Sequence, residues 1–306
     1  MIEKKTANYS QQRSLPGYEE ESRSPLNSQK KILIMGVVNC TPDSFSDGGL
    51  FLQTEKAVSH AMSLLEAGAD ILDIGGESTR PFSEPVDLEE EKRRVIPVIK
   101  EIRKRTKTLI SVDTQKAGVA RAALSVGADI VNDVSALRAD PDMAEVIKDF
   151  KCPVCLMHMK GTPRDMQVAP SYNDCVKEVY DFLEERLNYI ESLGISREMA
   201  IVDPGIGFGK RLNHNLELLA NLDYFKSLGA KVLIGVSRKS FLGEITGLKD
   251  PKERDIPTLG AVAWSVIRGA DIVRVHNVDW TRRLLQVVEA LMEHVRNGQH
   301  MSICRK

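Results

Sequence analysis

Four polar residues with complementary hydrogen-bonding groups stand at the ends of separate short apolar runs in this sequence. They are Asp113, Asn132, Asp203 and Lys239. A carboxylate accepts hydrogen bonds, an ammonium group donates them and an amide does both, so together these groups could bind the edge of a flat heterocycle. Each residue taken alone could equally cap a following helix. The four together favour a buried binding site. There an unpaired polar group costs about 1–3 kcal/mol, so a ring without the complementary donors and acceptors would bind poorly.

A second group of residues could hold a diphosphate. Arg274 and His276 lie two positions apart on one apolar run, so in a strand both side chains point to the same face. The guanidinium group of arginine donates hydrogen bonds in a fork that suits phosphate oxygens. A histidine within a strand is more often a satisfied core residue, and the neighbouring arginine shifts that balance only modestly. Asn39, after another apolar run, could offer a carbonyl oxygen to Mg²⁺, which favours oxygen ligands.

A repeated pattern indicates how these residues are brought together. Gly-Ala-Asp stands between a helical stretch and an apolar run at residues 67–71, 126–130 and 268–272, and residues 228–232 are a looser copy. A glycine in this position commonly ends a helix, and an apolar run within three residues indicates a short helix-to-strand loop. The pattern is typical of the alternating strands and helices of a parallel α/β fold.

Eight strands are predicted, with helices between them and after the last. The predicted strands are residues 32–38, 71–74, 109–112, 130–132, 154–157, 200–202, 232–236 and 272–275, and the predicted helices include 54–67, 88–105, 115–126, 174–193, 258–268 and 281–296. Eight such units favour a single closed (β/α)₈ TIM barrel over an open sheet. The distinctive polar residues follow the carboxyl ends of strands, where the active sites of such barrels lie. The opposite ends carry only Gly-Ala-Asp loops and solvated charge.

The composition argues against several other classes of protein. The 306-residue chain has 42 basic and 43 acidic residues, a net charge of −1, which argues against a nucleic-acid or membrane-surface binder. No apolar stretch approaches the roughly 20 residues of a membrane span, and the polar N-terminus lacks a secretory signal. The five scattered cysteines do not suggest disulfides, so we expect a cytoplasmic protein. Residues 1–30 are expected to form a flexible polar extension and residues 31–300 one barrel domain.

Two further motifs suggest other functions but fit their context poorly. Cys152 and Cys155 match C-x-x-C, but the motif enters a predicted strand and points the two sulfurs to opposite faces, so core cysteines are expected. Residues 205–210 are rich in glycine and end in lysine, yet they are one residue short of a phosphate-binding loop and are followed by Arg211. Neither a zinc or redox site nor a nucleotide site is predicted.

Four segments resemble the signature segments of the dihydropteroate synthase family of pterin-binding enzymes. They are residues 39–49, 78–81, 203–210 and 235–241, which stand in the family's order, and the resemblance extends from about residue 32 to the last predicted helix. It implies a transferase of folate biosynthesis that joins a dihydropterin diphosphate to 4-aminobenzoate and releases diphosphate. It also implies a Mg²⁺ cofactor and a homodimer formed through the later helices.

The resemblance gives a role to each residue that matches the family's motifs. The pterin diphosphate would be bound by Thr79, Asp113, Asn132, Met157, Asp203, Lys239, Arg274 and His276, Mg²⁺ by Asn39, and the aminobenzoate by Phe45, Arg80, Pro81, Phe208 and Ser240. Asp47, Arg80 and Lys239 are the catalytic candidates, with Asp47 stabilising the cation left by the departing diphosphate. No residue has to be a covalent nucleophile, so catalysis would rest on positioning and electrostatics. The glycine-rich loops 46–49 and 205–209 could close over the substrates.

Two other functions stay open at this point. A methyltetrahydrofolate-type pterin methyltransferase would share the pterin site but would not need the loops at 39–49 and 78–81. A catalytically silent pterin-binding homologue would be expected to lack some of the residues for metal, diphosphate and aminobenzoate. Asn39, Thr79, Arg80, Lys239, Arg274 and His276 are all present. Both observations favour the synthase.

Overall fold

Eight parallel strands close into a barrel in the computed structural model, which describes residues 31–41, 50–78, 83–162 and 164–297. The strands are β1 (Leu33–Asn39), β2 (Ile71–Gly75), β3 (Leu109–Asp113), β4 (Ile130–Asp133), β5 (Val154–Met157), β6 (Ala200–Asp203), β7 (Lys231–Ile234) and β8 (Ile272–Val275). The barrel closes where β8 pairs with β1, with Ile272 opposite Leu33. The predicted (β/α)₈ barrel is confirmed, and every predicted strand overlaps the observed one.

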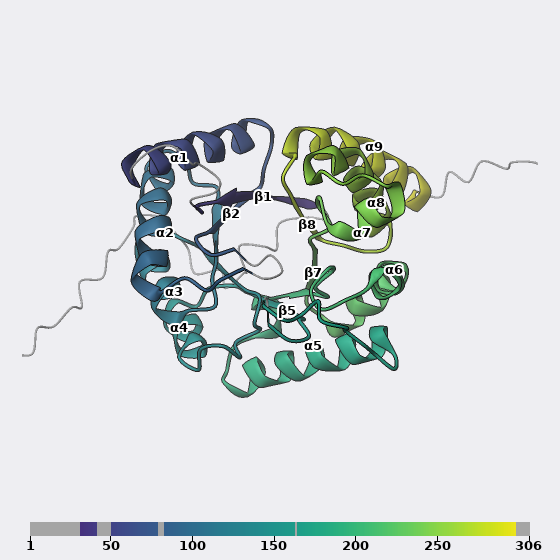
Figure 1. Cartoon of the computed structure of the whole chain (residues 1–306), viewed down its shortest axis with the longest axis horizontal. Coiled ribbons are helices and arrows are strands. Elements are labelled where there is room, and N and C mark those ends of the chain that lie inside the picture. The colour runs from purple at the N-terminus through teal and green to yellow at the C-terminus, as the bar shows by residue number, and fades with distance from the viewer. Residues whose placement is uncertain (1–30, 42–49, 79–82, 163, 298–306) are drawn as a thin grey trace, which may run out of the picture.

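The helices form a ring around the outside of the strands (Figure 1). They are α1 (Leu50–Glu66), α2 (Leu88–Arg103), α3 (Ala117–Ser125), α4 (Met143–Phe150), α5 (Cys175–Ser192), α6 (Leu212–Ala220), α7 (Ser240–Thr246), α8 (Asp255–Ile267) and α9 (Val278–Arg296). Side chains of Asp87, Asp174 and Asn277 accept hydrogen bonds from the first turns of α2, α5 and α9, which fixes where these helices begin. In the described part of the chain, no helix combines the length and apolar character needed to cross a membrane.

The inside of the barrel has two layers, because successive side chains of a strand point to opposite faces. The lower layer is apolar and forms a buried cluster separate from the core between strands and helices. Its members are Met35, Ile71, Ile130, Cys155, Ile201, Leu233 and Ile272. Two positions further along their strands stand Asp73, Asn132, Met157, Asp203 and Arg274. The period of two therefore places polar side chains in a second inner layer, at the carboxyl ends of the strands.

The repeated Gly-Ala-Asp loops lie at the opposite end of the barrel. Each aspartate accepts a hydrogen bond from a backbone N–H of the preceding strand, where Asp70, Asp129 and Asp271 bind the amides of Ile34, Ile110 and Val232 at 2.9, 2.8 and 2.7 Å. Each also forms an ion pair, Asp70 with Arg282, Asp129 with Arg103 and Asp271 with Lys226. The glycines that precede them have φ between 99° and 114°, a conformation that favours glycine. The repeat therefore joins neighbouring strands at this end.

The two cysteines of the C-x-x-C motif are free and belong to different parts of the core. Cys155 lies in the inner apolar cluster and Cys152 in the core between strands and helices. Burial raises the pKa of the Cys152 thiol to about 12, so it stays protonated at neutral pH. The prediction of core cysteines is confirmed.

Candidate active site

Arg274 joins two carboxylates across the bottom of the barrel mouth. Its Nε donates a hydrogen bond to Oδ2 of Asp73 at 2.6 Å, and its Nη2 donates to Oδ2 of Asp113 at 2.9 Å. Nδ2 of Asn132 lies 3.4 and 3.3 Å from the two carboxylate oxygens of Asp73. Asp73, Asp113 and Asn132 are all buried. These four residues, from β2, β3, β4 and β8, form a hydrogen-bonded layer that we call the floor.

Burial controls the charge on the floor. Loss of solvation raises the pKa of Asp113 to about 7, with Arg274 acting against the shift and Asp73 adding to it. Burial by itself would lower the pKa of Arg274, but Asp73 and Asp113 outweigh it and raise that pKa above its ordinary value. Arg274 therefore keeps its proton, whereas Asp113 exchanges one near neutral pH. A ligand that donates hydrogen bonds to Asp113 would favour its ionised form.

Asp203, Phe208 and Lys239 form a second part of the mouth, which we call the wall. Nζ of Lys239 lies 3.8 Å from the centroid of the Phe208 ring, a cation–π contact. Burial lowers the pKa of Lys239 to about 7, and the nearby Asp203 opposes this shift. Oδ1 of Asp203 accepts a hydrogen bond from Gly205 N at 2.7 Å, which leaves Oδ2 outside that bond. Burial raises the pKa of Asp203 despite the bond. The wall thus offers an acceptor, a donor and an aromatic ring.

A strained turn after β7 places Lys239 at the wall. Arg238 has a φ of 59°, in the left-handed region that disfavours side chains with a Cβ. Its guanidinium group binds both oxygens of Asp255, with Nε to Oδ1 at 2.6 Å and Nη2 to Oδ2 at 2.9 Å, and its backbone N–H donates to Thr258 Oγ1 at 3.0 Å. These contacts from α8 compensate for the strain and orient the next residue, Lys239, at the start of α7.

The segment after β6 packs closely against the end of β5. A Cβ added to Gly205 would lie 1.9 Å from the carbonyl oxygen of His158, and one on Gly209 would lie 2.4 Å from that of Lys160, so only glycine fits. Nζ of Lys210 is 2.9 Å from Nδ1 of His158 and donates to the carbonyl oxygen of Phe208 at 3.0 Å. These contacts are at odds with the expected lid role of residues 205–209 and instead fix Phe208 in the wall.

The residues predicted for diphosphate and metal lie near this floor, and their contacts differ. Arg274 uses Nε and Nη2 for the carboxylates, which leaves Nη1 outside those bonds. His276 is half-buried, with Nδ1 2.9 Å from the hydroxyl of Ser237. Asn39 is the half-buried last residue of β1. In the described part of the chain, no group of three or more His, Cys, Asp or Glu could hold a metal ion. A Mg²⁺ ion bound there would depend on oxygen from Asn39, water and phosphate.

The structure therefore brings most of the described predicted residues together. Met157 packs with Val134, Met159 and Met166 against Phe208, and Ser240 is the exposed first residue of α7. The predicted residues Phe45, Asp47, Thr79, Arg80 and Pro81 lie outside the described residues. The prediction missed Asp73, which binds both Arg274 and Asn132. The sequence did hold a signal for Asp73, because it is the single charged residue in the apolar run at 71–75 and follows Ile71 of the inner layer by two positions.

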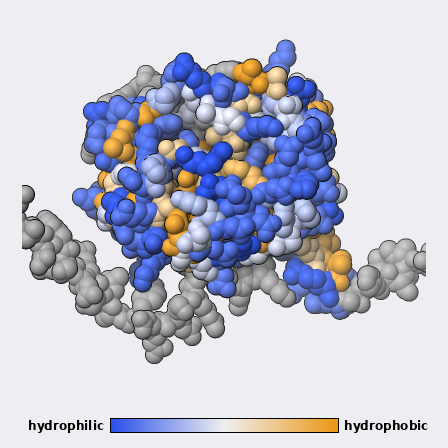
Figure 2. Space-filling view, turned by 90° about the horizontal axis from the view of Figure 1, so that it is seen from below, coloured by the Kyte–Doolittle hydropathy of each residue, from blue (hydrophilic) through white to orange (hydrophobic). Residues whose placement is uncertain are grey.

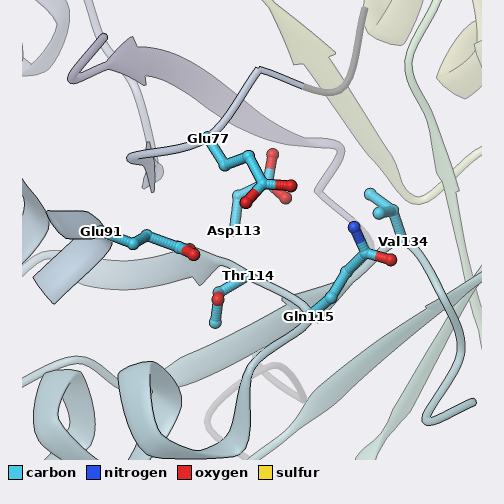
Figure 3. A pocket seen from close by; sticks show the side chains of 6 residues that line it. All are labelled: Glu77, Glu91, Asp113, Thr114, Gln115 and Val134. Atoms are coloured by element: carbon cyan, nitrogen blue, oxygen red, sulfur yellow. The ribbon is translucent and has the colours of Figure 1, made fainter. Parts of the chain in front are cut away.

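A small pocket adjoins the floor beside α2 (Figure 3). Its lining residues are Glu77, Glu91, Asp113, Thr114, Gln115 and Val134, and we call it the back pocket. Nζ of Lys116 donates to Oε2 of Glu77 and to Oε2 of Glu91, at 2.5 Å each. Oε1 of Glu91 is buried and has no hydrogen-bond partner among the described residues. Asp113 is thus shared by the floor and the back pocket.

Comparison with known proteins places this geometry among pterin-binding proteins. The family model for pterin binding enzymes matches residues 35–276. Dihydropteroate synthase of Escherichia coli K12 is 44% identical over 267 residues, which cover 87% of this chain and 94% of the relative. The Bacillus subtilis enzyme of the same name is 41% identical, over 90% of this chain and 94% of its own. A Xanthomonas albilineans dihydropteroate synthase solved with 4-aminobenzoic acid has a TM-score of 0.82 and 47% identity, covering 86% of this chain and 94% of that one.

Proposed function

The chain belongs to the pterin-binding enzymes and, within them, to the dihydropteroate synthase family, and we propose how its barrel mouth divides between the two substrates. The reaction joins a dihydropterin diphosphate to 4-aminobenzoate and releases diphosphate. One observation carries the assignment of substrates to residues. Complementary donors and acceptors from strands far apart in the sequence stand at one mouth of the barrel, where Asp113, Asn132 and Asp203 are buried and Asp113 binds Arg274. The half-buried Lys239 lies beside them, with its ammonium group against Phe208.

The floor and the wall together are proposed to bind the pterin ring. Asp113 and Asp203 would accept hydrogen bonds from ring donors, Asn132 would meet an edge with both donors and acceptors, and Lys239 would donate to a ring acceptor. Met157 supplies an apolar contact beside them. A Xanthomonas albilineans dihydropteroate synthase, 44% identical to this chain, has been solved with 7,8-dihydropteroate, the product of such a site. Its likeness to this chain supports the proposal.

The aminobenzoate is proposed to lie on the outer side of Phe208 and Lys239, toward Ser240. The Phe208 ring offers a flat apolar surface, and the ammonium group above it offers a positive charge to the aminobenzoate carboxylate. Phe45, Arg80 and Pro81 would complete this part of the site. A Yersinia pestis dihydropteroate synthase that is 39% identical to this chain has been solved with a sulfonamide drug. We therefore expect sulfonamides to compete with aminobenzoate here.

The diphosphate is proposed to leave toward Arg274, His276 and Asn39. Nη1 of Arg274 is free of the two carboxylate bonds, and His276 is held by Ser237, so both side chains can donate to phosphate oxygens. The amide oxygen of Asn39 suits Mg²⁺, which would neutralise diphosphate charge when bound. Thr79 would bind near the diphosphate, and Asp47, Arg80 and Lys239 would stabilise charge as the carbon–oxygen bond breaks and the aniline nitrogen attacks.

Incubation of the purified protein with dihydropterin diphosphate, 4-aminobenzoate and Mg²⁺ tests the activity. Dihydropteroate and diphosphate should form in equal amounts, and omission of aminobenzoate should stop dihydropteroate formation. Failure of folded protein to make either product would refute the function. Chelation of Mg²⁺ should reduce the rate, and an Asn39→Ala variant should need a higher Mg²⁺ concentration for half its maximal rate. An unchanged Mg²⁺ requirement in that variant would remove Asn39 from the metal site.

We further propose a homodimer formed through α8 and α9, helices that pack against each other in the structure. Apolar residues on their outer surfaces expose 49–65% of their area, namely Trp264, Ile267, Val287, Leu291 and Val295. The face on the side of α5 is mostly hydrophilic by contrast (Figure 2). Light scattering should give a dimer for the native chain and a monomer for Leu291→Glu, whereas Val168→Glu, at an exposed position elsewhere, should stay dimeric.

A cytoplasmic location completes the proposal. Four described cysteines, Cys40, Cys152, Cys155 and Cys175, are free and buried. Free thiols without disulfides are usual in a reducing compartment. Fractionation of cells that express a tagged copy of the chain would test this location. Recovery of the protein outside the cytoplasmic fraction would contradict it.

A further inference from the structure

The back pocket contains a carboxylate whose placement the proposed reaction does not explain. Glu91 lies on α2, is 1% exposed, and uses only Oε2 in its bond to Lys116. Its Oε1 is buried without a hydrogen-bond partner among the described residues. A buried carboxylate oxygen left unpaired costs free energy, so the fold gains little stability from placing Glu91 there. Figure 3 shows its carboxyl group directed toward Asp113.

We propose that Glu91 is a positioning residue that acts through Asp113 and sets the pH range in which Asp113 binds the pterin ring. This inference rests on the proposed function, in which Asp113 accepts hydrogen bonds as a carboxylate. Glu91 and Asp113 line the same small pocket, which Figure 3 shows from close by. A negative charge at Glu91 disfavours a second one at Asp113, and the low polarisability of a buried site makes this repulsion strong.

The charged groups that act on Asp113 among the described residues come from several elements. Arg274 of β8 favours its ionised form, whereas Asp73 of β2, Asp133 of β4 and Glu91 of α2 oppose it. Lys239, after β7, also interacts with Asp113. Glu77, two residues after β2, lines the same pocket and shares Lys116 with Glu91. Asp133 already accepts two hydrogen bonds, from the backbone N–H groups of Ser135 and Leu137. Among these opposing carboxylates, only Glu91 has a buried oxygen without a hydrogen-bond partner in the described part of the chain, and Glu91 also lines the back pocket.

The Glu91→Gln variant tests the proposal because it removes the charge and keeps the shape. The amide oxygen can still accept the hydrogen bond from Lys116, so the variant should fold. Affinity for dihydropterin diphosphate is measured by calorimetry from about pH 5 to pH 9 for native protein and variant. The native affinity should fall on the acid side as Asp113 takes up a proton. In the variant this acid limb should move to lower pH by about one unit. Protonation of the ligand itself changes the affinity of both proteins equally, so it does not affect the difference between them.

Glu89→Gln is the matched control, because Glu89 lies on the same helix and its exposed carboxylate pairs with Lys92. Its acid limb should coincide with that of the native protein. Equal acid limbs for native protein and Glu91→Gln would overturn the inference, and a purely structural role for Glu91 would lower stability without moving the limb. Failure of the native protein to bind the pterin would instead overturn the proposed function.

A second measurement covers the case in which Glu91→Gln does not fold. The carboxyl carbon of Asp113 can be titrated by ¹³C NMR in the native protein and assigned by its loss in Asp113→Asn. Its pKa should be well above that of an ordinary aspartate, and repeating the titration in Glu91→Asp should leave it raised because the charge remains. An ordinary pKa for Asp113 in the native protein would overturn the proposal.

Discussion

The two ends of this barrel use the same residue types in opposite ways. At the Gly-Ala-Asp end, Asp70 and Asp271 each accept a backbone hydrogen bond and pair with a cation, so their charges are satisfied within the fold. At the mouth, Asp113 and Asp203 are buried and their pKa values are raised, with oxygens left over for a ligand. Satisfied carboxylates stabilise the fold, whereas carboxylates with unused acceptors cost stability and provide binding.

Glycine shows the same difference between the two ends. Gly194, just after α5, has a φ of 81° and open space around a Cβ, so its only requirement is the left-handed backbone. Gly205, at the mouth, has a φ of 71° and no room at all beside the carbonyl oxygen of His158. Glycine therefore serves as a helix ending at one end and as a close backbone contact at the other.

Gly205→Ala should have the largest effect of the variants considered. The alanine Cβ would force the segment after β6 away from β5, which displaces Phe208 and costs about 3 kcal/mol or more of unfolding free energy. Activity should be lost even where the protein still folds. Gly194→Ala is the matched variant and should cost only about 1 kcal/mol, with catalysis unchanged. Urea denaturation and a steady-state assay measure both, and equal costs would show that the close contact is unimportant.

Asp203→Asn should be next in size and should affect binding rather than folding. The amide keeps one oxygen for Gly205 N but presents a donor where the carboxylate accepted, so about 1.5–3 kcal/mol of charge-assisted hydrogen bonding is lost. Affinity for the pterin diphosphate should fall about 10–100-fold. The midpoint of urea unfolding should stay the same or rise, because an ion is no longer buried. Unchanged pterin affinity would remove Asp203 from the site.

The sequence was sufficient to predict the end of the barrel that carries the site, because that inference needs only periodicity. The Gly-Ala-Asp repeats mark one end, and the alternation of strand residues places Asn132 and Asp203 on the inner face at the other. Asp73 was missed because it lies inside a strand and not after one. The pairing of Glu91 with Lys116 was not predictable, because Lys116, just before α3, reaches Glu91 on α2 and Glu77 after β2, which are distant in the sequence. Charged stretches of a helix are usually exposed to solvent, yet Glu91 of α2 is buried.

Asp271→Ala should show the reverse of Asp203→Asn. The variant leaves the backbone N–H of Val232 without its acceptor and removes the partner of Lys226. Both changes are at the Gly-Ala-Asp end, so we expect a loss of about 1–2 kcal/mol in unfolding free energy. Pterin affinity should stay within experimental error of the native value. A fall in pterin affinity that exceeds the change in stability would mean that the two ends are energetically coupled.

The smallest predicted effect is a pH dependence of stability that comes from the floor. The pKa of Asp113 is about 7 in the folded protein, compared with about 3.9 in an unfolded chain. Between these values the folded state binds more protons than the unfolded state, so stability falls as the pH rises through this window. The Asp113→Asn variant cannot ionise at this position, so its stability should not fall in this way. The difference in unfolding free energy, variant minus native, should therefore increase by about 1 kcal/mol from pH 6 to pH 7.

The direction of that change distinguishes the empty floor from a floor that holds a pterin. A carboxylate whose folded-state pKa is depressed would lose stability as the pH falls, which is the opposite sign. Asp113 bound to a pterin should behave in this opposite way, because ligand donors favour its ionised form. Urea unfolding of the native protein and Asp113→Asn, each with and without saturating pterin diphosphate, measures both slopes. If the unliganded native protein loses no stability relative to the variant as the pH rises, then Asp113 is already satisfied in the empty floor, as the aspartates at the other end are.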